Sequence, residues 1–133
     1  MGKQGIGLIF LIMIFGMLAD LLLIEHFESF WQFVPVVFLA VSGIGYFLIL
    51  KGTGLSLFRV WMYVGMLAGV VGIYMHVRNN WEFAIELRSN LKGWELITEV
   101  ATGAIPVISP GFLIPIAMLG LYVATQIKNE NTN

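Results

Sequence analysis

The sequence predicts an all-α membrane protein: a four-helix transmembrane bundle with an interfacial amphipathic helical connector between the third and fourth spans. Hydrophobic residues make up 59% of the chain and charged residues only 11%, whereas an ordinary soluble domain is about 25% charged. A soluble domain of 133 residues exposes so much of its chain that it could not hide this apolar surface. The composition therefore excludes a soluble globular domain and a disordered chain.

Four long apolar stretches account for the high hydrophobic content. Each is close to the length that a helix needs to cross roughly 30 Å of hydrocarbon. Helices are expected because lipid offers no partners for exposed backbone groups, and the short alternating pattern of transmembrane strands is absent. We therefore expect residues 1–133 to form a single integral membrane domain. Its predicted spans are residues 6–24, 33–50, 57–75 and 111–127.

The connector is predicted over residues 77–110. It mixes charged side chains with aliphatic residues and with Trp81 and Trp94, and Gly93 interrupts it. This mixture is typical of short amphipathic helices at a membrane surface, with tryptophan at the level of the headgroups. We expect the connector to lie on the outer side of the membrane.

Four spans place both termini on the same side of the membrane. That side carries the bases Lys3, Lys51, Arg59 and Lys128, whereas acidic residues dominate the opposite side. Basic residues in short loops favour the cytoplasm. We therefore expect both termini to be cytoplasmic.

Both histidines of the chain are expected on the outer face, because they follow the first and third spans. Imidazole and carboxylate together suit zinc, copper, manganese or iron, so a divalent-metal site is one hypothesis. The spacing does not match a ligand motif such as His-Glu-x-x-His, and solvated interfacial side chains are the alternative. The candidate metal ligands are His26, His76, Glu25, Glu28, Glu82 and Glu86.

A stripe of small residues in the third span leads to one of these histidines. Gly65, Gly69, Gly72 and His76 follow one another at steps of four, three and four. Such a stripe most often packs against another helix. It could also admit a flat macrocycle, and two histidines from different helices can ligate haem b. The position of both histidines at span ends argues against haem.

Asp20 is the only carboxylate within a predicted span. Acids inside the membrane often carry protons or bind ions, which would suit a small ion- or proton-conducting oligomer. The alternative is a protonated or hydrogen-bonded aspartate that stabilises the packing of the bundle, with Tyr74, Ser42 or a backbone carbonyl as its partner. The sequence leaves both interpretations open.

Several functional classes lack support in the sequence. The chain has no cysteine, which excludes disulfides and thiolate metal sites. It has no phosphate-binding loop, no nucleophile elbow and no Ser/His/Asp arrangement, so no catalytic residue is assigned. No basic tract is present that would bind nucleic acid.

We therefore expect a non-enzymatic accessory or structural protein in the lipid bilayer, as a homo-oligomer or part of a larger membrane complex. The alternatives are a haem- or metal-dependent redox protein using His26 and His76, or an ion conductor using Asp20.

Four short motifs spread over nearly the whole chain resemble those of a group of uncharacterised bacterial four-span inner-membrane proteins. The resemblance implies a four-span fold and a location in the bacterial inner (plasma) membrane. It implies no activity, because none is established for that group. The motifs are Glu25-His26, Trp31-Gln32-x-x-Pro35, His76-x-x-x-Asn80-x-Glu82-Phe83-x-x-Glu86 and Ser109-Pro110-Gly111.

Overall fold

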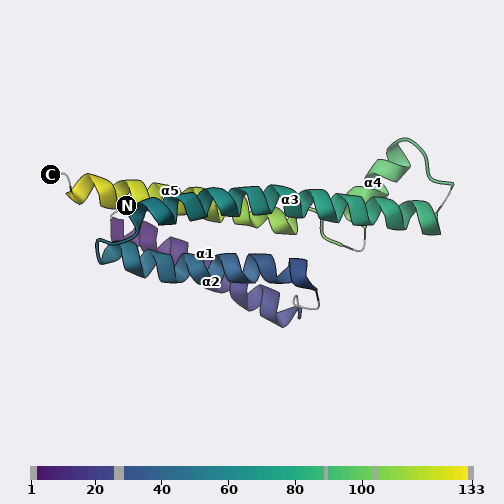
Figure 1. Ribbon diagram of the computed structural model, residues 1–133. Coiled ribbons are helices and arrows are strands. Elements are labelled where there is room, and N and C mark those ends of the chain that lie inside the picture. The colour runs from purple at the N-terminus through teal and green to yellow at the C-terminus, as the bar shows by residue number, and fades with distance from the viewer. Residues whose placement is uncertain (1–2, 26–28, 89, 104, 132–133) are drawn as a thin grey trace.

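The structure is a computed structural model that describes residues 3–25, 29–88, 90–103 and 105–131. This part of the chain is helical and contains no strand, as the sequence predicts. Figure 1 shows the order of the elements along the chain. They are α1 (Lys3–Leu23), α2 (Phe30–Leu50), α3 (Leu55–Leu87), α4 (Trp94–Thr102), the short 3₁₀ helix η1 (Ser109–Phe112) and α5 (Leu113–Asn131).

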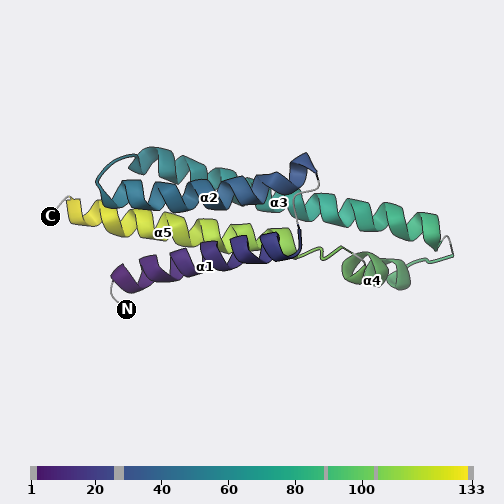
Figure 2. The ribbon, with the colours of Figure 1, turned by 90° about the horizontal axis from the view of Figure 1, so that it is seen from below.

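Four helices are long and apolar enough to cross a membrane: α1, α2, α3, and α5 together with η1. This confirms the prediction of an all-α, multi-pass membrane protein. The four run side by side as a bundle, and the ends of α1 and α5 that carry the chain termini lie at the same end of it (Figures 1 and 2). The third helix packs most extensively against α5 and then against α2.

The interior of the bundle is apolar and closely packed. Phe10 of α1, Leu39 of α2 and Met62 of α3 are completely buried. The ring of Phe10 meets the ring of Phe58 edge-on, with centroids 6.1 Å apart. Large apolar side chains such as Leu67 also cover the outer faces of the bundle. Apolar residues on both sides of a helix are expected where lipid is the solvent.

A tight turn joins α2 to α3. Gly52 and Gly54 have φ values of +79° and +74°, a left-handed region that glycine enters without a steric penalty. The amide of Gly52 donates to the carbonyl of Ile49 at 3.0 Å. The turn makes α2 and α3 antiparallel neighbours at the end of the bundle that also holds the chain termini.

The third helix is longer than the span that the sequence predicts. It continues from Met75, the expected end of the span, to Leu87, about three further turns. Residues 77–87 contain neither glycine nor proline, so nothing in the sequence breaks the helix there. A helix of 33 residues is about 50 Å long, compared with a hydrocarbon thickness of about 30 Å. The extra turns extend beyond the other three long helices (Figure 2).

The expected connector is helical, but its first part is this straight continuation of α3. The short helix α4 then returns beside the extension and contacts it (Figures 1 and 2). We call residues 77–87 of α3 together with α4 the outer hairpin, because they lie outside the bundle formed by the four long helices. Its first helix is directed along the bundle axis, which differs from the helices lying in the membrane plane that the sequence suggests.

Candidate functional site

One face of α3 receives the chain that returns toward the last span. Gly65, Gly69, Gly72, His76 and Asn80 follow one another at helical steps of three or four, which places them on one face. All five are buried or half-buried. The face that begins with the three glycines thus continues through His76 to Asn80, which lies in the outer hairpin.

The three glycines of this face lie against other parts of the protein. A Cβ at Gly65 would overlap the ring of Phe38 from α2, and a Cβ at Gly72 would lie 2.5 Å from the Cβ of Pro110 in η1. A Cβ at Gly69 would lie 2.8 Å from Ile114 in α5. The glycines therefore allow close packing of α2, η1 and α5, and protein side chains occupy the space where a macrocycle would have to lie.

His76 bonds α3 to the segment between α4 and η1. Its Nδ1 lies 2.9 Å from the carbonyl oxygen of Pro106. A carbonyl oxygen only accepts hydrogen bonds, so this geometry assigns the proton to Nδ1. In the neutral imidazole, Nε2 then keeps its lone pair, which can bind a metal ion.

Asn80 makes a second attachment one turn further along α3. Its side chain is 3% exposed. Its Nδ2 donates to the carbonyl of Val100 at 2.9 Å and to the carbonyl of Ile105 at 2.8 Å. Its Oδ1 accepts from the amide of Ile105 at 3.2 Å. The end of α4 and the segment after it are therefore held against α3 by one buried amide.

The sequence does not predict the role of Asn80, which is named there only as part of a motif. Its spacing of four residues from His76 is the one available signal, since it extends the glycine stripe. The partners lie 20 and 25 residues away, in a segment without a periodic pattern. Sequence alone could not separate this buried amide from a solvated one.

The carboxylates of the predicted metal site do not converge in the described part of the chain. Glu82 pairs with Arg78 at 2.8 Å, both side chains being more than half exposed, and Glu25 and Glu86 are exposed. Within residues 3–25, 29–88, 90–103 and 105–131, no group of three or more metal-binding side chains is present. His26 and Glu28 lie outside the described residues, so the shared metal site stays a prediction.

Asp20 is exposed on the outward side of α1. A Cβ at Gly16, one turn before it, would meet nothing within 4 Å. The two side chains expected as its partners do not contact it, because Tyr74 is 65% exposed and Ser42 bonds to Phe38 and Trp61; no hydrogen bond to a backbone carbonyl of the described residues is present either. Among the described residues, the Asp20 carboxylate has no hydrogen-bonding or ion-pair partner. A role of Asp20 in stabilising the packing of the bundle is therefore not supported by the contacts in this part of the chain.

The polar partner of Ser42 is Trp61. Its indole N–H lies 3.1 Å from the Ser42 hydroxyl oxygen, and that hydroxyl donates to the carbonyl of Phe38 at 2.6 Å. The Trp61 and Phe38 rings stack with centroids 5.7 Å apart. Trp61 is thus a packing residue between α2 and α3.

No protein-family model matches the chain, and no curated protein or solved structure is significantly similar to it. The resemblance to bacterial four-span proteins therefore remains an expectation from short motifs.

Proposed function

We propose that this protein is a non-enzymatic accessory component of the bacterial inner membrane, which binds a partner membrane protein through its outer hairpin. Both termini are cytoplasmic in this proposal, so the hairpin projects from the outer face. The charge distribution supports this orientation, because Lys51 directly follows α2 and Arg59 is the fifth residue of α3, and the turn between these helices lies at the end of the bundle that holds the termini (Figure 1).

The observation that carries the proposal is the apolar surface of the outer hairpin. Trp81 and Ile85 share one face of α3 and are 44% and 47% exposed, while Phe83 and Leu87 share another and are 50% and 66% exposed. Large apolar side chains outside the hydrocarbon region mark protein or membrane contact sites. On the hairpin, they extend over about three turns beyond the length needed to cross the bilayer.

The hairpin is also held in a defined conformation. Asn80 binds the end of α4, and Arg88 pairs with Glu99 at 2.8 Å, joining the two helices near the tip. A surface that is already ordered loses less conformational entropy when a partner binds. This rigidity favours a docking role over that of a passive connector.

A photoreactive amino acid tests the proposal in living cells. We expect it to form a discrete protein adduct when it replaces Phe83 or Ile97 in the hairpin. It should form none when it replaces Leu67 or Val41, which are 64% and 40% exposed on the spans. An adduct of twice the mass of the chain would identify a second copy as the partner. Absence of protein adducts at both hairpin positions would contradict the proposal.

Binding of a divalent metal at His76 is the second candidate function. The bond from Nδ1 to Pro106 orients the ring and leaves Nε2 free, as in histidines that bind metals. His26, Glu25, Glu28, Glu82 and Glu86 would be its companions. Elemental analysis of the purified protein should find zinc, copper, manganese or iron that is lost in both His26→Ala and His76→Ala. A Soret band lost in the same variants would indicate haem b instead, and a metal-free protein would reject both.

A further inference from the structure

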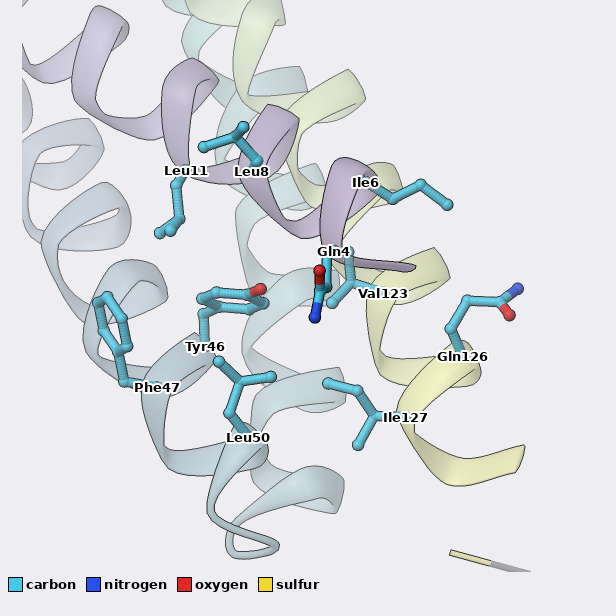
Figure 3. A pocket seen from close by; sticks show the side chains of 10 residues that line it. All are labelled: Gln4, Ile6, Leu8, Leu11, Tyr46, Phe47, Leu50, Val123, Gln126 and Ile127. Carbon is cyan, nitrogen blue, oxygen red and sulfur yellow. The ribbon is translucent and has the colours of Figure 1, made fainter. Parts of the chain in front are cut away.

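A cavity of about 510 Å³ lies at the end of the bundle that holds the chain termini, between α1, α2 and α5. Figure 3 shows its lining: residues from the start of α1, the end of α2 and the end of α5. It is at the opposite end of α3 from the outer hairpin and is independent of the function proposed above. Its volume falls within the range of about 300–1,000 Å³ that is typical of small-molecule sites.

Most of the lining is apolar. Leu8 and Leu11 of α1, Phe47 of α2 and Val123 of α5 surround the space. Leu8 and Phe47 are also more than half exposed on the outer surface of the bundle, where the membrane lipid would lie. An apolar molecule could therefore reach the cavity from the bilayer without crossing water.

Tyr46 supplies a polar group that has no hydrogen-bonding partner in the part of the chain that the structure describes. Its side chain is only 8% exposed, and its ring is fixed by edge-on contact with Phe10 at 5.7 Å. No described residue forms a hydrogen bond with its hydroxyl. Figure 3 shows this hydroxyl directed into the cavity, on the side where Gln4 lies. The ring is buried, but the hydroxyl oxygen itself is accessible from the cavity, so a ligand there can exchange hydrogen bonds with it.

Gly7 explains how the hydroxyl reaches this position. A Cβ there would overlap the oxygen of Tyr46, so the lack of a side chain lets the phenol lie against the backbone of α1. The position of the hydroxyl is therefore defined by the packing of two helices, as a binding site requires.

The other polar groups of the lining are uncharged. They are the side-chain amides of Gln4 and Gln126, each of which can donate and accept hydrogen bonds. Among the residues that the structure describes, no acidic or basic side chain lines the cavity. A charged head would have to leave water without a counter-charge, which is costly, whereas an uncharged oxygen could bond to the phenol and to the amides.

We propose that this cavity binds an amphiphile dissolved in the membrane, whose body is apolar and whose uncharged head carries oxygen atoms that bond to Tyr46. The carbonyl of a quinone and the glycerol ester of a neutral lipid share this chemistry. Tyr46 positions the head, Gln4 and Gln126 offer further hydrogen bonds, and the leucines surround the tail.

Titration of the full-length protein in detergent tests the proposal, with bound ligand counted by native mass spectrometry. The probes are a short-chain ubiquinone and monoolein. We expect binding of at least one probe, and Tyr46→Phe should weaken it about twofold to tenfold, the value of one hydrogen bond. Tyr63→Phe is the matched control, because Tyr63 is 62% exposed and lies outside the cavity. Binding of only one probe would identify the head.

A second pair of variants tests the cavity itself. Leu8→Trp would fill the cavity from its edge and should abolish binding. Ile12→Trp is one turn away, at a position that is 60% exposed against 58% for Leu8, and should bind like the wild type. The proposal is overturned if neither probe binds, if Tyr46→Phe binds as tightly as the wild type, or if both tryptophan variants behave alike. Equal affinity for an anionic lysolipid with the monoolein chain would refute the uncharged head.

Discussion

The Nδ1 of His76 and the carbonyl oxygen of Pro106 lie 2.9 Å apart, although the two residues are separated by 30 positions in the chain. One turn further along the same face, Asn80 binds Ile105 through both its amide nitrogen and its oxygen. These bonds fix the register between α3 and the segment that leads into α5. The outer hairpin is thereby joined rigidly to the bundle.

Replacement of Asn80 should release this attachment. In Asn80→Ala, two carbonyls and one amide lose their partner, and each buried unsatisfied group costs about 1–3 kcal/mol. We expect the free energy of unfolding to fall by at least about 2 kcal/mol, measured by SDS titration. Proteolysis should also become faster between α4 and η1.

Asn79→Ala is the control for this variant, because Asn79 is the exposed neighbour of Asn80. A surface substitution of this kind changes stability by about 0.5 kcal/mol or less. Equal effects of the two substitutions would show that the Asn80 bonds do not hold the hairpin.

Two glycines in different spans should respond oppositely to alanine. At Gly72 the new Cβ would lie 2.5 Å from the ring of Pro110, which is rigid and cannot move aside. We expect a loss of about 1–3 kcal/mol from such overpacking. At Gly16 nothing lies within 4 Å, and alanine should stabilise the helix by up to about 1 kcal/mol. Thermal unfolding in one detergent compares them, and destabilisation by Gly16→Ala would instead reveal an unseen helix partner.

The sequence predicted the spans because apolar length is a direct consequence of bilayer thickness. It located the end of the third span at Met75, where charged residues begin, although α3 continues to Leu87. Hydropathy reports where a helix leaves lipid, and it does not report where the helix ends. The absence of glycine and proline from residues 77–87 was the signal that favoured a continuous helix.

The candidate site was less accessible to sequence reasoning. His76 and the glycine stripe stood out because their helical spacing is local. Asn80 did not, because its partners lie 20 and 25 residues away, and such partners depend on how the helices pack. The sequence offers Ser42 as a candidate partner of Asp20, whereas its partners in the structure are Trp61 and Phe38.

Substitution of Trp61 tests the contact between α2 and α3. Trp61→Phe removes the N–H that reaches Ser42 and part of the ring that stacks on Phe38. We expect a loss of about 1–3 kcal/mol, the usual range for a damaged core contact. Trp81→Phe is the control, since Trp81 is 44% exposed and should be nearly neutral in the isolated protein. Similar melting temperatures for the two variants would contradict a structural role for Trp61.

The Asp20→Asn variant separates an accessory protein from an ion conductor. The buried polar side chains of the described bundle are Ser42 and Asn80, which do not provide a polar path across the membrane. We therefore expect proton flux into liposomes to be the same for the wild type, the variant and empty liposomes. Flux that is present in the wild type and lost in Asp20→Asn would support a conducting oligomer in place of our proposal.

The depth of Leu87 in the membrane tests the projecting hairpin most directly. The chain has no cysteine, so a single cysteine at residue 87 can carry a spin label, with residue 67 as the control within the span. The end of α3 lies about 18 Å beyond Met75 along a straight helix. Power saturation in liposomes should show the label at residue 87 exposed to a water-soluble nickel reagent, and the label at residue 67 accessible only to oxygen. A label at residue 87 at the depth of the hydrocarbon boundary would contradict the account, because the hairpin would then lie flat on the membrane.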